Sequence, residues 1–118
     1  MTLARVRYLQ KQLIKRYGII GKVASRYLEA GLSVRIRHPT RLGDAHIIVQ
    51  GNGNRLVVEV YTSPKPLQPR DVQAVAEKAK LLNSKPVIVI YSGGRLKSRV
   101  TKEALEEATR LQVKIKRV

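Results

Sequence analysis

The sequence predicts a single α/β domain in which a mixed central β-sheet is flanked by helices. Two helical patterns open the chain, Val- and Ile-rich segments of strand length follow, and helical segments then alternate with strands. A length of 118 residues and a hydrophobic fraction of 43% suit one core. No repeat, linker or low-complexity segment divides the chain, so we treat residues 1–118 as one domain.

Two helices are expected at the start of the chain. Apolar side chains recur every three to four positions over residues 3–17, with Arg and Lys between them, which predicts an amphipathic basic helix. Gly18 interrupts this pattern. A second apolar stripe begins at Ile20 and stops at Ala30 and Gly31, where we expect a C-terminal cap.

Three consecutive strands are expected next. Apolar and basic residues alternate over residues 32–37, which predicts a strand with one buried and one basic face, ended by Pro39. The segments 45–50 and 55–62 are apolar on both faces, so we expect them near the centre of the sheet, covered by helices. The sequence Gly-Asn-Gly-Asn at 51–54 indicates a tight hairpin between them.

The second half of the chain alternates helix and strand. Pro69 suits the first turn of a helix expected over residues 69–82. The continuous apolar run at 86–91 predicts a buried strand parallel to its neighbour, with that helix as the crossover. A last helix, capped by Thr101, and a short strand at 113–118 complete the expected order.

Charge is the strongest indication of function. The chain carries 24 Lys and Arg against 8 Asp and Glu, which gives a formal net charge of +16. Such a surface repels itself, and its usual partner is a polyanion, because each phosphate contact releases condensed counterions. We therefore expect a nucleic acid as partner, rather than a basic surface that is merely solvated.

The residue types that are absent narrow the chemistry. The sequence has no Cys, which excludes disulfides, thiolate zinc sites and cysteine nucleophiles and suits a reducing compartment. It has no apolar run of about 18 residues, and its start carries charges where a signal peptide needs apolar residues. We expect a cytoplasmic protein that does not enter a membrane. The single Met and the many ionic residues also suit a thermophile.

Two acids in the predicted hairpin form the candidate site. With residues 52–53 as the turn, His46 lies opposite Glu59. Asp44 then lies opposite Tyr61 on the same face. The carboxylates of Asp44 and Glu59 become diagonal neighbours with Cβ atoms roughly 7 to 8 Å apart, within reach of one divalent cation. The alternative, to which we give equal weight, is a buried carboxylate paired with Arg or Lys.

These residues resemble the PD-(D/E)XK nuclease superfamily and, within it, the archaeal Holliday junction resolvases. The likeness rests on the order helix, three strands, helix, strand, on Gly43-Asp44, on the segment Glu-Val-Tyr-Thr-Ser at 59–63, and on Gln73. It implies a restriction-endonuclease-like αβββαβ core. It also implies an endonuclease in which Asp44 and Glu59 hold Mg²⁺ for hydrolysis of a phosphodiester, while Gln73 helps to orient the site. DNA such as a four-way junction is then favoured over RNA, and a homodimer is expected.

Two departures from the family pattern bear on catalysis. Tyr61 stands where the E-x-K motif has a lysine that stabilises charge in the transition state. The first core helix also lacks the Glu that many members carry. Lys65, Lys78 and Lys80 are candidate substitutes for the lysine, and the sequence does not choose among them. His46 is either an extra metal ligand or a hydrogen-bonded strand residue.

The expected nucleic-acid contacts surround this site. Glu29 is the only acid before Asp44, and the loop at 38–42 joins a basic strand to the acidic one. No base-reading helix of a recognised type is present, so we expect recognition of backbone and shape with a steep salt dependence. The candidate contacts are Lys22, Arg26, Arg35, Arg37, Arg41, Arg95, Lys97 and Arg99.

Two functions from different classes remain at this stage. The first is a magnesium-dependent endonuclease that acts on structured DNA, which the retention of both acids favours. The second is a catalytically degenerate protein of nuclease-like fold that binds DNA or structured RNA as a structural or accessory factor, which the missing motif lysine favours. A protein that binds structured RNA, such as a ribosome-associated component, is a weaker third alternative.

Overall fold

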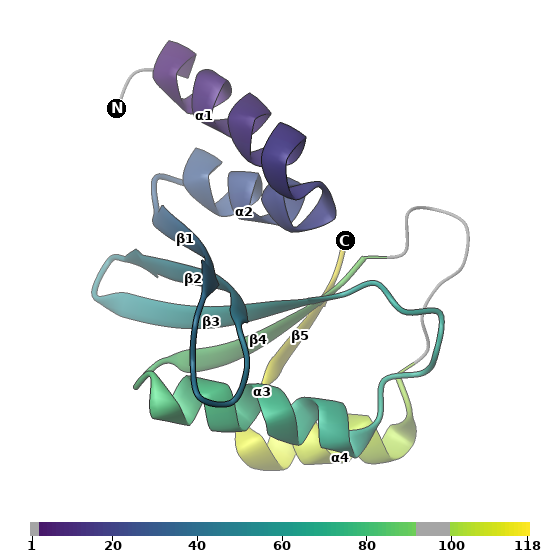
Figure 1. Ribbon diagram of the computed structural model, residues 1–118. Coiled ribbons are helices and arrows are strands. Elements are labelled where there is room, and N and C mark those ends of the chain that lie inside the picture. Colours follow the sequence, from purple (N-terminus) through teal and green to yellow (C-terminus); the bar gives the residue numbers. More distant parts are fainter. Residues whose placement is uncertain (1–2, 92–99) are drawn as a thin grey trace.

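Within residues 3–91 and 100–118, which the computed structural model describes, five strands form one mixed sheet between helices (Figure 1). The helices are α1 (Leu3–Tyr17), α2 (Ile19–Glu29), α3 (Pro69–Leu81) and α4 (Lys102–Leu111). The strands are β1 (Ser33–His38), β2 (Ala45–Gly51), β3 (Asn54–Tyr61), β4 (Lys85–Ile90) and β5 (Lys114–Arg117). This single α/β domain confirms the predicted fold class.

The strands lie in the sheet in the order in which they occur in the chain. β1, β2 and β3 are antiparallel neighbours, whereas β3, β4 and β5 run parallel. A parallel connection needs a crossover, and α3 and α4 supply the two that are required here. The predicted parallel strand and its crossover helix are therefore confirmed, and the elements from α2 to β4 follow the expected αβββαβ order.

The β2–β3 hairpin has the predicted turn and register. Ile47 pairs with Val58, and the pairing continues to the turn. Asn52 has a φ of 53° and Gly53 a φ of 76°, so both turn residues adopt the left-handed conformation that a two-residue type I′ turn requires. Ile47 and Ile48 are both buried although they point to opposite faces, because helices cover both sides of the sheet.

The two faces of the sheet are covered differently. α3 and α4 pack side by side against one face, through a cluster that includes Val72 and Ala104. On the other face, Val23 and Ala24 of α2 pack on the sheet, and α1 lies outside α2 (Figure 1). α1 has no buried residue. No helix in the described part of the chain is both long and apolar enough to span a membrane.

A glycine permits the close approach of α1 to α2. A Cβ atom at Gly21 would lie only 2.0 Å from the backbone oxygen of Leu13 in α1. Gly18, with a φ of 59°, turns the chain between the two helices in a conformation that L side chains rarely adopt. These two glycines allow two basic helices to pack against each other.

Candidate functional site

Glu59 is a buried acid at the centre of the sheet, with 8% of its surface exposed. Its Oε1 accepts a hydrogen bond of 3.1 Å from Nζ of Lys78 on α3. Its Oε2 lies 3.0 Å from Nδ1 of His46 on β2. An unpaired carboxylate would be costly to desolvate at this depth, and the two basic partners offset that cost. The alternative of a buried carboxylate paired with Lys is therefore what the structure contains.

These contacts determine the charge of Glu59. Burial raises the pKa of its carboxyl, but the hydrogen bonds and charges of His46 and Lys78 outweigh burial and leave the pKa below its usual value. An ionised carboxylate only accepts hydrogen bonds, so the contact with His46 needs a proton on Nδ1. The same nitrogen lies 3.0 Å from the backbone nitrogen of Val60. Because that N–H can bond only to an unprotonated Nδ1, the two contacts are alternatives.

Lys78 connects α3 to β3 and to the residue that precedes β2. Besides Glu59, its Nζ donates a hydrogen bond of 3.1 Å to the backbone oxygen of Asp44. Helical periodicity explains its position, because the buried Val75 lies three residues earlier on the same side of α3. Of the three lysines that the sequence offered as substitutes, Lys78 is the one in contact with Glu59, whereas Lys80 is exposed.

The other two predicted catalytic residues make no direct hydrogen bond or ion pair with Glu59 among the described residues. We expected Asp44 within the apolar strand, but it is exposed and precedes β2, because the turn ending at Gly43 (φ 103°) carries the chain out of the sheet. Its backbone carbonyl, rather than its carboxylate, contacts Lys78. Gln73 donates from Nε2 to Oε2 of Glu107 on α4, over 2.7 Å. Among the described residues, no contact joins Gln73 to Glu59.

The donors around Glu59 do not fit a magnesium ion as they stand. Mg²⁺ requires oxygen ligands in a near-octahedral arrangement. Both oxygens of Glu59 are held by basic groups, so a cation there would have to displace Lys78 and His46. In the part of the chain that the structure describes, no three His, Asp or Glu side chains are grouped so that they could hold a metal ion.

A cavity of about 150 Å³ lies beside Glu59. Its lining includes His46, Glu59, Tyr61, Asp71 and Lys78. Tyr61, which the sequence resemblance aligns with the motif lysine, donates a hydrogen bond of 3.1 Å to the backbone oxygen of Lys65. Asp71 was not among the predicted site residues. Its Oδ2 accepts a 2.8 Å hydrogen bond from the backbone of Gln68, as part of a capping box that the spacing of these two residues could have indicated.

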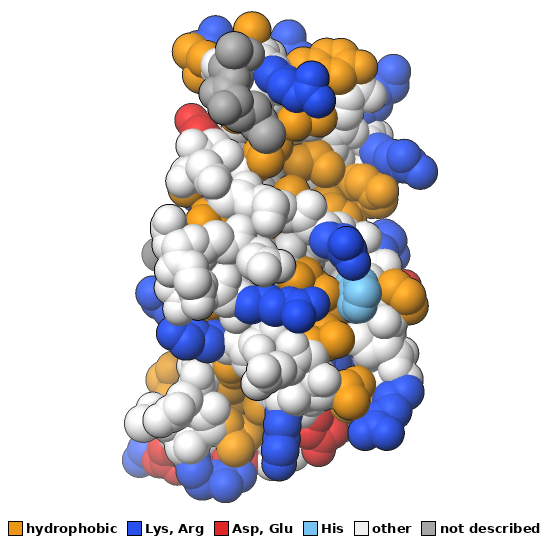
Figure 2. Space-filling view, turned by 90° about the vertical axis from the view of Figure 1, so that its left-hand side faces the viewer, with side chains coloured by type: hydrophobic (Ala, Val, Ile, Leu, Met, Phe, Trp, Pro, Cys, Tyr) orange, Lys and Arg blue, Asp and Glu red, His pale blue; other side chains and the backbone are white. Residues whose placement is uncertain are grey.

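The predicted nucleic-acid contacts fall on different parts of the surface. Arg35 pairs with Ile48, which places it on the sheet face to which Glu59 belongs. Arg37, with a φ of 53°, lies further along β1, and Arg41 lies between β1 and β2. Both are exposed. Figure 2 shows Lys and Arg side chains over the full height of the face that it views, with sparse acidic side chains among them. The predicted contacts at Arg95, Lys97 and Arg99 lie outside the described residues.

Lys22 and Arg26 belong to a separate basic depression lined by residues of α1 and α2. Together with Arg7 and Lys11 they line a hollow of about 350 Å³. None of the four has a carboxylate within 4.0 Å among the described residues. We call this feature the α1–α2 basic depression. Arg7 and Lys11 were not among the predicted contacts, although the i,i+4 spacing of cations in each of two consecutive helices is a signal for them.

Comparisons with known proteins find similar folds, and they show neither a family nor a function for this chain. No protein-family profile and no curated protein matches the chain. The fold is similar to that in the crystal structure of AF1548, a protein of unknown function, with a TM-score of 0.64 and 14% identity over 80% of this chain and 54% of that one. It is also similar to Pyrococcus furiosus SfsA in complex with Ca²⁺, with a TM-score of 0.55 and 17% identity over 94% of this chain and 56% of that one.

The chain therefore spans about half the length of both solved structures. Identities of 14% and 17% indicate a distant structural relationship and a common fold. They carry no activity over to this chain. Membership of the PD-(D/E)XK superfamily accordingly stays a prediction, as does a resolvase-like activity.

Proposed function

We propose that this domain binds nucleic acid through contacts to the phosphate backbone, without cutting it. The observation that carries the proposal is the α1–α2 basic depression. Four cations from two helices line it, none of them has a carboxylate within 4.0 Å among the described residues, and the formal net charge of the chain is +16. Like charges gathered in this way repel one another, and phosphate groups would relieve that repulsion while releasing counterions.

The expected mode of recognition follows from the side chains involved. Lys and Arg contacts to phosphates position a nucleic acid without reading its sequence. Two helices packed through Gly21 form a fixed surface, so the spacing of the four cations is set by the fold. We infer binding that depends on the shape of the nucleic acid and on salt, with double-stranded or junction DNA as the favoured partner.

In this proposal the contacts that Glu59 makes with His46 and Lys78 have a structural role. Glu59, His46 and Lys78 link β3, β2 and α3, and Lys78 also holds the loop before β2 through the Asp44 carbonyl. The carboxylate is thus committed to internal contacts. The domain would be a nuclease-like fold that retains binding, which is the second of the two functions left open by the sequence.

Phosphodiester hydrolysis remains the second candidate, because one observation favours it. Lys78 lies against Glu59 and so supplies an ammonium group at the acid whose motif lysine is missing. The solved structure of SfsA contains Ca²⁺, a divalent cation. For hydrolysis, Glu59 would have to exchange its present partners for a cation, with Asp44 as a further ligand.

One assay separates the two candidates. Labelled four-way junction, linear duplex and single-stranded DNA, with a matching RNA duplex, are incubated with the protein in EDTA, in Mg²⁺ and in Mn²⁺, alongside Asp44→Asn and Glu59→Gln. Binding in EDTA with intact DNA in every metal supports the proposal. Metal-dependent cleavage that is lost in both variants would establish the enzyme instead. Absence of binding at low salt would overturn the proposal itself.

A further inference from the structure

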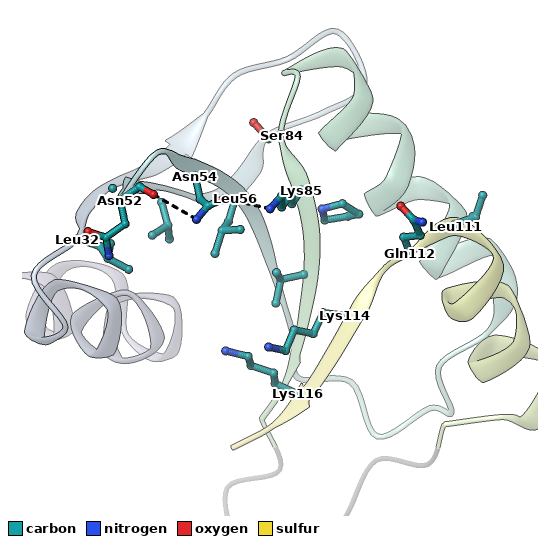
Figure 3. A pocket seen from close by; sticks show the side chains of 14 residues that line it. Leu32, Asn52, Asn54, Leu56, Ser84, Lys85, Leu111, Gln112, Lys114 and Lys116 are labelled. Atoms are coloured by element: carbon teal, nitrogen blue, oxygen red, sulfur yellow. Dashed lines mark hydrogen bonds between the residues drawn. The ribbon is translucent and has the colours of Figure 1, made fainter.

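One end of the sheet is left open on the face that α2 covers. α3 and α4 both pack on the opposite face, whereas α1 lies on α2 and adds little cover to the sheet. The result is a groove of about 620 Å³ at the β4–β5 end, bordered by the β2–β3 hairpin (Figure 3). Its lining residues are different from those of the Glu59 cavity and of the α1–α2 basic depression.

Lysines of neighbouring strands face this groove. Lys114 and Lys116 alternate on β5 and pair with Val87 and Val89, whose side chains belong to the α2 side of the sheet. Lys85 lies two residues before Val87 and therefore on the same face. In Figure 3 the amino ends of Lys114 and Lys116 extend over the sheet toward the side formed by Leu32 and the hairpin.

Two of these three amines have neutral partners. Nζ of Lys85 donates a 3.0 Å hydrogen bond to Oδ1 of Asn54, and Nζ of Lys116 lies 5.7 Å from the ring centre of Tyr27. No carboxylate of the described residues lies within 4.0 Å of Lys85, Lys114 or Lys116. An anionic ligand would supply the missing countercharge.

The floor and the margins of the groove place further requirements on a ligand. Leu56 and Val87 form an apolar floor, and Asn52 and Gln112 place side-chain amides at its margins. A ligand that fills the groove must therefore combine anionic groups with a flat apolar surface and polar edges. The phosphates, base faces and base edges of a nucleotide have these properties.

We propose that this groove binds single-stranded nucleic acid, with phosphates at Lys114 and Lys116 and a base on the floor formed by Leu56 and Val87. Alternate residues of a strand are about 6.6 Å apart, which is comparable to the separation of successive phosphates in an extended strand. A duplex keeps its base faces stacked inside and would leave the apolar floor uncovered. This inference is independent of the proposed duplex contact, which uses different residues, on α1 and α2.

The test measures binding of a labelled oligothymidine by fluorescence anisotropy in EDTA. Lys114→Gln/Lys116→Gln is compared with Lys80→Gln/Lys102→Gln, which removes two exposed lysines of α3 and α4 and leaves the same net charge. We expect the groove variant to bind the single strand at least tenfold more weakly, and its plot of log affinity against log salt to be less steep by about 1.4. The control should lose less than threefold.

Separate titrations followed by NMR identify the class of ligand. An acidic peptide rich in Glu and Leu, and a mononucleotide, are titrated separately into isotope-labelled protein. Shifts of the Asn54, Leu56 and Lys114 amides with oligothymidine support the proposal. Equal losses in both lysine variants, or groove shifts with the acidic peptide or the mononucleotide but not with the single strand, would overturn it. Duplex binding is measured on the same variants. A groove variant that binds duplex like the parent but shows no specific loss of single-strand binding would overturn this inference alone, and a parent protein that binds the single strand but no duplex would overturn only the proposed duplex contact.

Discussion

Nζ of Lys78 and Oε1 of Glu59 lie 3.1 Å apart, in a pair whose side chains are 17% and 10% exposed. The pair joins α3 to β3, and through the Asp44 carbonyl it also holds the loop that leads into β2. A nuclease would need this carboxylate available to a cation, whereas here it accepts hydrogen bonds from the protein itself. The relationship therefore bears on stability as directly as on function.

Removal of the ammonium group is expected to destabilise the fold. Lys78→Met keeps most of the side-chain volume but leaves Glu59 with His46 alone, and breaking a buried ion pair costs about 3 kcal/mol. The double variant Glu59→Gln/Lys78→Met should recover most of that loss, because no buried charge is left unpaired. Urea unfolding measures both, with the exposed neighbour Lys80→Met as a control that changes the unfolding free energy by about 0.5 kcal/mol or less. A Lys78→Met protein as stable as the parent would contradict the role of the pair.

Stability is expected to fall in acid because of Glu59. Its pKa in the folded protein is lowered, and an exposed glutamate titrates near about 4.3, so the unfolded state binds its proton first as the pH decreases. The contribution of this group is therefore present above that pH and is lost as the pH falls through the folded pKa. Unfolding free energies of the parent and of Glu59→Gln, measured from pH 7 to pH 2.5, should converge below about pH 4. A difference that is constant over this range would show that Glu59 does not titrate as described.

Gly21 links the packing of α1 to the proposed binding surface. Gly21→Ala places a methyl group where the backbone of Leu13 lies, so α1 must shift on α2, at a cost of about 1–3 kcal/mol in unfolding free energy. The shift should separate Arg7 and Lys11 from Lys22 and Arg26 and so weaken duplex binding. Gly53→Ala is the control, because it strains the hairpin turn (φ 76°) far from α1 and should lower stability without changing duplex affinity. If Gly21→Ala binds duplex like the parent, the depression is not the contact surface.

Local patterns predicted the elements well, because each has a short-range cause. The apolar period over 3–17 coincides with α1, and Thr101 caps α4 by accepting a hydrogen bond from the backbone of Ala104. The Asn52-Gly53 turn fixed the register that brings His46 to Glu59. These features depend on neighbours in sequence or on one hairpin.

The site was harder to predict, because its composition depends on tertiary placement. Asp44 and Glu59 were predicted as diagonal neighbours on two apolar strands, yet Asp44 precedes β2 and is exposed. Gln73 lies on the side of α3 that meets α4, and its amide bonds to Glu107. Lys78 could have been selected from helical phase, because the buried Val75 precedes it by three residues on the same side of the helix.

The salt dependence of duplex binding tests the central proposal most directly. Affinity for a labelled duplex is measured from low to moderate salt for the parent, for Lys22→Gln/Arg26→Gln, and for Arg55→Gln/Lys102→Gln, which removes one exposed Lys and one exposed Arg elsewhere. Because each phosphate contact contributes about 0.9 to the slope of log affinity against log salt, the first variant should bind more weakly with a slope shallower by about 1.8. The second should keep the parental slope. Equal slopes in the two variants, or a parent protein that binds no duplex at low salt, would contradict the proposal.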